Sequence, residues 1–421
     1  MRRNLYFKKV FCSLLCIAVL ITSALTGVFQ TRIYAQELSL EVHFVDVGQG
    51  DCIIIQLPDG KDMIVDAGDK NSQTEQKILS YIEANFSDLD FFDYAIVTHT
   101  DSDHLGCMDE VLQAYPAMTV YRPNVIASRE SFTDPVLAIT QDNAITDDNI
   151  KLWNDEGASI EVNDKNTIVY KEFIEQAYQP FEIDGVQHTP KVIVSDGRIN
   201  QRPQGKQSQD ITGQNYSITF YSPLSYSYTD VNDYSNIFIL EYQGFEFFLS
   251  GDAEKHAEEQ FVQEYKDQNF DIDVFKLGHH GSRTSSSSQL IELITKESKR
   301  EQVYATISCG EGNKYNHPHT ETLQRLRDFG FLEKNIVRTD TSSDLVFEVR
   351  KANGVYNLYY NDTVIEKKDD IFSQIEEYIN KFFVDLSQGE TYAIIILTVI
   401  IVGIILVVII TKNNYSKRKK N

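Results

Sequence analysis

Cysteine is scarce in this chain, and the few cysteines do not form a recognisable framework. The 421 residues contain five, at positions 12, 16, 52, 107 and 309, and the first two lie in an apolar stretch near the N-terminus. The other three are an odd number without a recurring spacing. This pattern argues against a disulfide-stapled fold and against a thiolate metal site.

Basic residues are scarce in the central part of the chain. Residues 1–35 and residues 391–421 each carry five of the 39 lysines and arginines, and neither segment carries an acidic residue. The remaining 29 basic residues share the central segment with all 62 acidic residues, which gives that segment a formal net charge of −33. Such a charge is typical of a soluble exterior domain, and it disfavours electrostatic attraction of long nucleic acids.

Long apolar runs are missing except near the two ends. With 42% hydrophobic and 24% charged residues, the composition is that of a folded soluble protein. It excludes both a disordered chain and a protein with many membrane spans. The chain is long enough to bury a full hydrophobic core, and it contains no internal repeat or low-complexity tract.

The N-terminal apolar run has the pattern of an export signal. Four basic residues precede or flank the start of a stretch that ends near residue 28, and Ala35 offers a small side chain at a cleavage point. We therefore predict a signal peptide over residues 1–35. An uncleaved signal anchor is the alternative, and it would export the body as well.

The C-terminal run predicts a single membrane-spanning helix. Residues 391–411 are rich in isoleucine, leucine and valine, and a helix of this length can cross a bilayer about 30 Å thick. The tail at 412–421 is basic, and basic residues stay on the cytoplasmic side, so residues 36–390 would lie outside the cell membrane. Residues 370–388 predict an amphipathic juxtamembrane helix. It would lie on the membrane or close the domain, and its acidic residues favour the second position.

Residues 36–365 have the pattern of one layered α/β domain. Strands and helices alternate in a way that predicts central sheets covered by helices. Residues 122–215 break this rhythm because they are polar and rich in Asn, Asp and Gln, and we predict an insertion over the site or at its rim. Strand patterns lie at 38–45, 52–57, 61–65, 94–98, 216–221, 237–242 and 245–249, and helical patterns lie near 73–84, 254–265 and 320–328.

The densest group of reactive side chains follows the strand that ends at residue 98. His99, Asp101, Asp103 and His104 are four potential metal ligands within six residues, and strand ends are where α/β enzymes place such groups. Imidazole combined with carboxylate suits zinc or manganese rather than a soft thiolate site. For this segment alone, a solvated acidic turn is the alternative.

Three further polar clusters follow predicted strands. Asp66 ends an early strand, Asp252 lies in a Ser-Gly-Asp turn, and His279 and His280 lie in a glycine turn. Each cluster alone would be ordinary turn chemistry. Their joint occurrence at strand ends predicts one pocket that holds metal ions.

The order of these motifs resembles the metallo-β-lactamase superfamily, and most closely the hydrolase domain of ComEC-type competence proteins. Residues 43–51 (His-Phe-Val-Asp-Val-Gly-Gln-Gly-Asp) resemble the opening motif of that branch, and residues 308–318 resemble its late motif. Asp101 stands where most of the superfamily has a second histidine. The match covers about residues 38–350 without the insertion, and it implies an αββα sandwich and a metal-dependent hydrolase.

The resemblance also implies which residues of this pocket would bind metal ions. Asp252 would bridge two divalent ions, zinc or manganese, and the other ligands would be shared between the two ions. No clear counterpart exists for a further ligand histidine that many members carry, because His188 in that interval lies within the predicted insertion. The remaining ligands implied are His99, Asp101, Asp103, His104 and one histidine of the pair His279 and His280.

The candidate catalytic residues are Asp103, Asp66, Lys276 and His317. Asp66 would orient a ligand imidazole. Lys276 and His317, together with Ser282, would hold an anionic substrate or protonate the leaving group. Ordinary structural use is the alternative for each of these three side chains.

The expectation is therefore an extracytoplasmic, membrane-anchored hydrolase with two metal ions, and most specifically a phosphodiesterase or nuclease. Its partner would be a phosphodiester: a nucleic acid, a nucleotide or an envelope polymer. Two alternatives stay open, which are hydrolysis of a carbon ester, amide or lactone and a non-catalytic surface domain on the same scaffold. Asp101 and the late motif resemble those of relatives that act on phosphoesters, and this resemblance favours the phosphodiester.

Overall fold

The computed structural model describes residues 39–123, 168–195, 210–225 and 228–365, together with positions 125, 128–129, 132–133 and 197. The predicted signal segment, juxtamembrane helix, membrane-spanning helix and basic tail all lie outside these residues. Among the helices of the described part, none combines the length and apolarity that crossing a bilayer requires.

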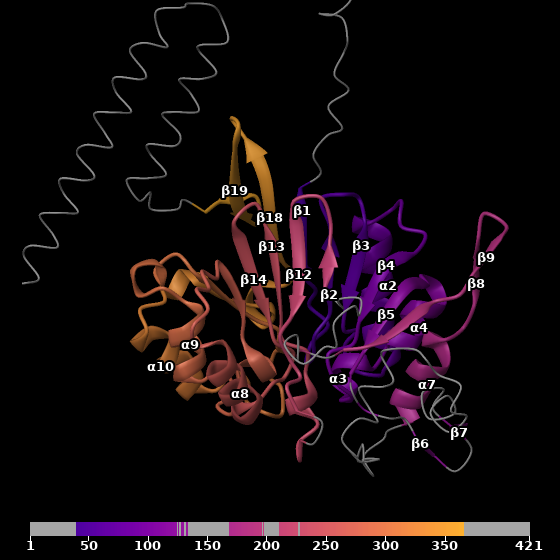
Figure 1. Cartoon of the computed structure of the whole chain (residues 1–421), viewed down its shortest axis with the longest axis horizontal. Coiled ribbons are helices and arrows are strands. Elements are labelled where there is room, and N and C mark those ends of the chain that lie inside the picture. Colours follow the sequence, from indigo (N-terminus) through magenta and orange to yellow (C-terminus); the bar gives the residue numbers. More distant parts are fainter. Residues whose placement is uncertain are drawn as a thin grey trace, which may run out of the picture. The chain divides into compact units, whose positions relative to one another are not determined.

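Two β-sheets form the centre of the described part (Figure 1). The first sheet contains, in spatial order, β10 (Lys191–Val194), β5 (Ala117–Arg122), β4 (Phe92–Ile96), β3 (Asp62–Val65), β2 (Ile53–Gln56), β1 (Leu40–Phe44), β18 (Leu345–Ala352), β19 (Val355–Tyr360) and β20 (Thr363–Val364). The second contains β11 (Ile211–Thr212), β12 (Tyr216–Phe220), β13 (Phe238–Tyr242), β14 (Phe245–Leu249), β15 (Val274–Lys276), β16 (Tyr304–Ile307) and β17 (Ile336–Arg338).

Aromatic side chains pack the two sheets against each other. Tyr121 of β5 stacks on Phe220 of β12 with ring centroids 5.1 Å apart, and Phe347 of β18 meets Phe247 of β14 at 6.4 Å. Both contacts join the first sheet to the second, so the sheets face each other across a common apolar layer.

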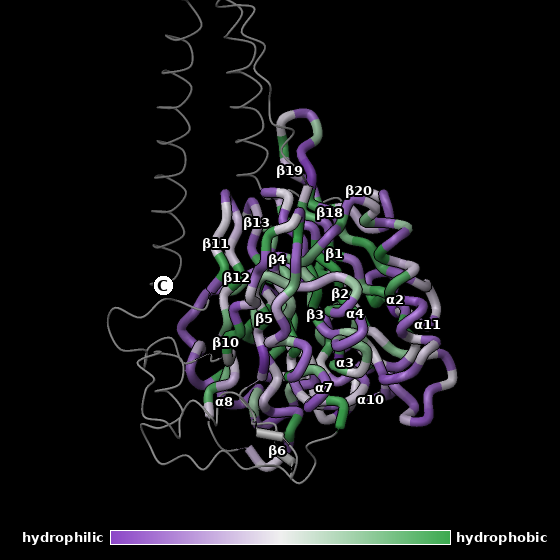
Figure 2. The backbone as a smooth tube through the Cα atoms, turned by 90° about the vertical axis from the view of Figure 1, so that its right-hand side faces the viewer, coloured by the Kyte–Doolittle hydropathy of each residue, from purple (hydrophilic) through white to green (hydrophobic). Residues whose placement is uncertain are grey.

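Helices cover the outer face of each sheet. On the first sheet, Ile78, Val111 and Phe173 from three helices pack in one buried cluster with strand residues. On the second sheet, Phe261 and Ile291 pack in another such cluster. Figure 2 shows hydrophobic segments in the strands and hydrophilic segments toward the periphery. The helices are α2 (Ser72–Asn85), α4 (Met108–Ala114) and α7 (Ile168–Ala177) on the first sheet, and α8 (Lys255–Tyr265), α9 (Ser288–Ile294) and α10 (Thr320–Asp328) on the second.

This arrangement confirms the predicted αββα layering. The remaining short elements are α3 (Ser102–Leu105), α11 (Thr339–Ser342), η2 (Asn232–Tyr234), η3 (Gly278–Gly281), η4 (Glu297–Lys299), η5 (Glu333–Asn335), and the hairpins β6 (Ser128–Arg129) with β7 (Phe132–Thr133) and β8 (Phe181–Ile183) with β9 (Val186–His188). Residues Lys351–Asn357, which include the end of β18 and the start of β19, belong to a second, smaller compact unit of the chain. Within them, the Lys351 ammonium lies 5.2 Å from the Tyr356 ring centroid.

Parts of the range 122–215, where an insertion is predicted, are integral to the first layer. Helix α7 packs on α4 through Phe173 and Ile174, which are fully buried. Strand β10 pairs in parallel with β5. The polar composition of residues 122–215 gives no clear pattern for α7 or β10. Each is buried by an element from another part of the chain, α4 for the helix and β5 for the strand.

Parallel strands bring the polar clusters to one edge. Strands β3, β4 and β5 are parallel neighbours in the first sheet, and β14, β15 and β16 are parallel neighbours in the second. Because the carboxyl ends of parallel strands meet at the same edge, the turns after these strands lie close together.

Candidate metal centre

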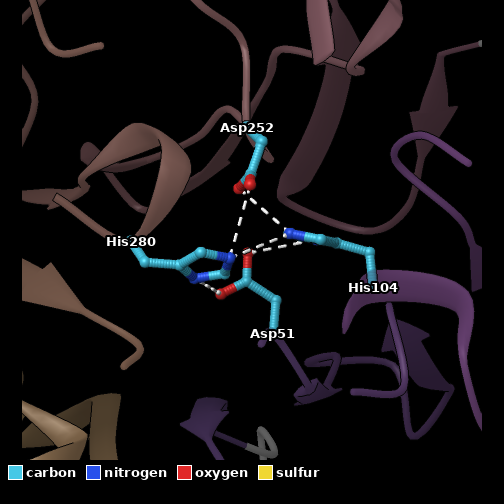
Figure 3. Close-up of side chains that lie close together, drawn as sticks. All are labelled: Asp51, His104, Asp252 and His280. Carbon is cyan, nitrogen blue, oxygen red and sulfur yellow. Dashed lines mark hydrogen bonds and ion pairs between the residues drawn. The ribbon is translucent and has the colours of Figure 1, made fainter. Parts of the chain in front are cut away.

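Each predicted ligand cluster lies in a turn that leaves a strand at this edge. Asp66 follows β3, residues 99–104 follow β4, Asp252 follows β14, and His279 and His280 lie in η3 after β15. The structure brings side chains from both sheets into one buried group (Figure 3). The polar clusters that follow separate strands therefore meet in one place, as the sequence predicted.

The group in Figure 3 consists of Asp51, His104, Asp252 and His280, and Asp103 lies beside His280. Nε2 of His104 lies 3.2 Å from Nε2 of His280 and 3.0 Å from Oδ1 of Asp252. Nε2 of His280 lies 3.3 Å from Oδ2 of Asp252 and 3.3 Å from Oδ2 of Asp103. Ligand atoms about 2.0–2.1 Å from a tetrahedral zinc ion are separated by about 3.3 Å. These four spacings therefore fit ligands that surround one cation.

Four imidazoles of the site use their two nitrogens in the same way. In each ring Nδ1 is held by a neighbour, which leaves Nε2 as the available donor atom. The Nδ1 partners are Asp66 for His104 (2.7 Å), the Ser308 carbonyl for His280 (2.9 Å), Glu254 for His279 (3.0 Å) and the Thr98 hydroxyl for His99 (3.1 Å). We assign the Nδ1–H tautomer to all four rings on these contacts. Both histidines of the 279–280 pair therefore have the arrangement of ligands.

Asp66 fixes the position of His104 rather than binding at the centre. One oxygen accepts hydrogen bonds from the Thr98 hydroxyl at 2.6 Å and from Nδ1 of His104 at 2.7 Å. The other accepts from the Thr98 backbone N–H at 2.8 Å. Asp66 is fully buried, and its geometry fits the predicted role of an orienting carboxylate.

Replacing Asp66 with asparagine should therefore weaken metal binding roughly 10- to 100-fold, because the amide cannot accept both hydrogen bonds in the same way. Competition of the full chain with a chelating indicator for Zn²⁺ or Mn²⁺ measures this affinity. Asp88→Asn, an exposed substitution in the turn before β4, serves as the control. Unchanged affinity in Asp66→Asn would contradict the role.

Three more predicted ligands lie around this centre. Nε2 of His99 is buried and, within the described residues, has no hydrogen-bond partner; it lies 4.0 Å from Oδ2 of Asp101. Nε2 of His279 lies 3.8 Å from Oδ2 of Asp252. An imidazole nitrogen buried without a partner is costly. A cation beside His99 would satisfy it.

Negative charge exceeds positive charge in the group. Burial, followed by the nearby Asp103, raises the pKa of the Asp101 carboxyl to about 6. Burial lowers the pKa of His104, but Asp252 and Asp66 outweigh it and hold that pKa well above its usual value. The carboxylates therefore favour added positive charge at Nε2, either as protons or as a metal ion, and metal affinity should fall with falling pH.

The backbone of the site is strained. Asp66, His279 and His280 have φ angles of 59°, 48° and 53°, a left-handed conformation that non-glycine residues rarely adopt. Such strain persists only where the surrounding structure enforces it, and it clusters at functional sites. Here it turns the side chains of two different sheets toward one point.

Asp51 also belongs to the candidate metal-binding group, although the sequence did not single it out as a site residue. Its carboxylate lies on the Nδ1 side of the imidazoles, 3.5 Å from His104 and 3.7 Å from His280 (Figure 3). Oδ2 of Asp51 also lies 2.6 Å from the Lys276 ammonium. The Asp51 N–H donates to the Asp103 carbonyl, and a Cβ on Gly50 would lie 2.3 Å from that same oxygen. The Gly-Gln-Gly-Asp turn was the available signal, because only glycine allows this close approach.

The other candidate catalytic residues occupy different positions. Lys276 is buried, and its ammonium also donates to the carbonyls of Gly251 and Leu277. That position fits a counter-charge for Asp51 better than a substrate contact. The ring of His317 lies beside the site, with its centroid 5.3 Å from that of His279. Burial and the neighbouring His280 and His279 lower the pKa of His317 to about 4, so its ring is neutral near pH 7.

Comparison with known proteins agrees with this site. Residues 45–169 match the family described as the metallo-beta-lactamase superfamily. ComE operon protein 3 of Bacillus subtilis is 21% identical over 76% of this chain and 34% of that protein. Recombination protein 2 of Haemophilus influenzae is 22% identical over 76% of this chain and 31% of that protein.

A third relative, competence protein ComA of Neisseria gonorrhoeae, is 30% identical over 35% of this chain and 21% of that protein. The chain thus spans about a third or less of the length of the curated relatives it matches. These matches confirm the resemblance that the sequence motifs predicted.

Proposed function

We propose that this chain, which carries a metallo-β-lactamase superfamily domain similar to that of ComEC-type competence proteins, is a metal-dependent phosphodiesterase. We propose further that two divalent ions, zinc or manganese, bind at the site. Nucleic acid, a nucleotide or a phosphodiester of the cell envelope would be the substrate.

One observation carries this proposal: four imidazoles present Nε2 toward three carboxylates at the shared edge of the two sheets. His104, His280 and Asp103 would hold one ion, and Asp252 faces them with both oxygens. The second ion would be held by His99, Asp101 and His279, and Asp252 would bridge the two. His279 would be the second imidazole ligand of the second ion, beside His99.

Bound metal ions would supply activated water near neutral pH and would stabilise negative charge on phosphoryl oxygens. The protein's part is to keep the ligands rigid. Asp66, Glu254 and the Ser308 carbonyl hold three imidazoles by Nδ1. Neutral His317, beside His279, would accept or donate a hydrogen bond at the substrate without adding charge.

A carboxylate ligand at Asp101 supports the choice of phosphodiester over carbon ester. An oxygen ligand in place of imidazole makes the site harder and favours oxygen-loving ions such as manganese. Such ions are well suited to clamp phosphoryl oxygens. The location that we propose, outside the cell membrane with a C-terminal anchor, rests on the basic and apolar pattern of residues 391–421.

A substrate screen of the full-length chain, purified in detergent without chelator, tests this function. We expect bound metal by elemental analysis, and hydrolysis of bis(p-nitrophenyl) phosphate that depends on added Mn²⁺ or Zn²⁺. Nitrocefin and p-nitrophenyl acetate test the carbon-substrate alternative in parallel. The Asp88→Asn variant should behave as the unmodified chain does.

The screen also separates the alternatives. Efficient turnover of nitrocefin or the acetate ester without phosphodiester cleavage would replace the proposed activity by carbon-ester or amide hydrolysis. Protein that binds no metal and cleaves none of these compounds would indicate a non-catalytic surface domain.

A further inference from the structure

The loop after β16 places an aromatic side chain beside the metal centre. This loop, residues 310–318, contains His317, whose ring centroid lies 5.3 Å from that of His279 and 6.1 Å from that of His280. The ring of Tyr315 stacks on His317 with centroids 5.6 Å apart and an interplanar angle of 22°. Tyr315 therefore contacts His317, which in turn contacts the imidazoles of His279 and His280.

Hydrogen bonds between the Asn313 side chain and the backbone hold this loop in place. The Asn313 amide nitrogen donates to the carbonyls of Gly310 and His317, and its oxygen accepts from the backbone N–H groups of Tyr315 and His317. The position of Tyr315 is thus fixed by its loop. Burial of its own ring is not needed to orient it.

The ring of Tyr315 remains available to a ligand. Its side chain is 47% exposed, and it is the only aromatic residue among the exposed large hydrophobic side chains of the described residues. The Lys314 ammonium lies over this ring, 4.8 Å from its centroid, and Lys314 is solvent-exposed, so a stacking ligand would take the place of this ammonium. Underneath, His317 is only 8% exposed, and its Nδ1 has no hydrogen-bond partner among the described residues. A partly exposed ring beside the metal centre, stacked on a histidine with an unsatisfied buried nitrogen, is a candidate contact for a bound molecule.

We propose that Tyr315 is a stacking platform for a nucleobase next to the scissile phosphodiester, with Lys314 beside it for the phosphate. This inference rests on the proposed phosphodiesterase function. A central segment with a net charge of −33 repels polyanions, so a nucleic-acid substrate would need a source of affinity other than general electrostatic attraction. Base stacking supplies affinity that does not depend on charge, and it accepts any base.

Cleavage assays on matched substrates test the platform. We compare the full-length chain with Tyr315→Ala and Tyr315→Phe on a short oligothymidine and on an abasic oligonucleotide of equal length. Tyr315→Ala should lower kcat/KM on the oligothymidine roughly 5- to 150-fold, mainly through KM, with little change on the abasic strand. Tyr315→Phe keeps the ring and should retain the preference.

Binding measurements keep this inference separate from the activity. Fluorescence anisotropy with metal-free protein compares the affinities for the same two oligonucleotides and does not require turnover. A base-dependent affinity that Tyr315→Ala removes supports the platform even if no phosphodiester is cleaved, in which case only the proposed function fails. Equal affinity for both strands, equal losses on both, or a preference for ring-free glycerol phosphodiesters overturns the platform.

Discussion

Replacing Asp252 with asparagine should lower metal-dependent kcat/KM by roughly 10³-fold or more and remove bound metal. Asp252 lies 3.0 Å from Nε2 of His104, 3.3 Å from Nε2 of His280 and 3.8 Å from Nε2 of His279. Among the described residues, no other carboxylate pairs with all three of these rings. Charge stabilisation by a bound metal is worth several kcal/mol, and each 1.36 kcal/mol corresponds to a factor of ten in rate.

The asparagine variant should still fold, which makes the result interpretable. Asparagine has nearly the shape of aspartate, and the backbone N–H of residue 252 would keep its hydrogen bond to the Ser235 hydroxyl. Elemental analysis, kcat/KM and circular dichroism on the full-length chain form the measurement, and Asp88→Asn is the matched control. A variant with full metal content and undiminished turnover would refute the assignment of Asp252 as the shared ligand.

The convergence of these candidate ligands was predictable because each lies within a few residues of a strand's carboxyl end. His104 lies in α3 after β4, Asp252 follows β14, and His280 lies in η3 after β15, and a strand's end fixes the edge of the sheet at which the following segment begins. A sequence pattern can therefore predict that they meet. It cannot predict distances, and the choice between His279 and His280 needed the left-handed turn of η3, which directs both rings to Asp252.

Asp51 and Lys276 show where sequence reasoning fails. The turn that contains Asp51 looks like ordinary hairpin chemistry, and its role depends on Gly50 packing against the Asp103 carbonyl, 53 residues along the chain. For Lys276 the sequence leaves a substrate contact and ordinary structural use open. Its side chain is buried against Asp51, which fits the structural use. Such pairings are properties of tertiary packing, which no local pattern encodes.

Dependence on tertiary packing also explains why α7 and β10 were not recognised within residues 122–215, where an insertion is predicted. Helix α7 has buried Tyr170 and Phe173, but the helix is recognisable as part of the first layer only through its contact with α4. Strand β10 is four residues long and is held by β5. Short elements whose burial comes from distant partners have too weak a local pattern to be distinguished from a polar loop.

The buried Asp51–Lys276 pair connects the two sheets behind the imidazoles. Asp51 belongs to the turn between β1 and β2 in the first sheet, and Lys276 is the last residue of β15 in the second. Both side chains are only 1% exposed. Burial lowers the pKa of Lys276, but Asp51 and Asp252 outweigh it and raise that pKa above its usual value. The lysine is therefore charged at neutral pH, and its contribution to stability is lost only as pH rises through its folded-state pKa.

Replacing Lys276 with methionine should destabilise the fold by about 3–5 kcal/mol, because it leaves the Asp51 carboxylate buried without its cation. The double variant Asp51→Leu with Lys276→Met removes both charges and should recover a substantial part of this loss. Urea denaturation of the full-length chain, followed by circular dichroism near pH 7, measures both. If Lys276→Met and the double variant were equally unstable, the lost alkyl packing of the lysine would account for the effect. Partial recovery would instead show that the unpaired Asp51 carboxylate is what destabilises the single variant, and that the buried pair stabilises the junction of the two sheets only while both charges are present.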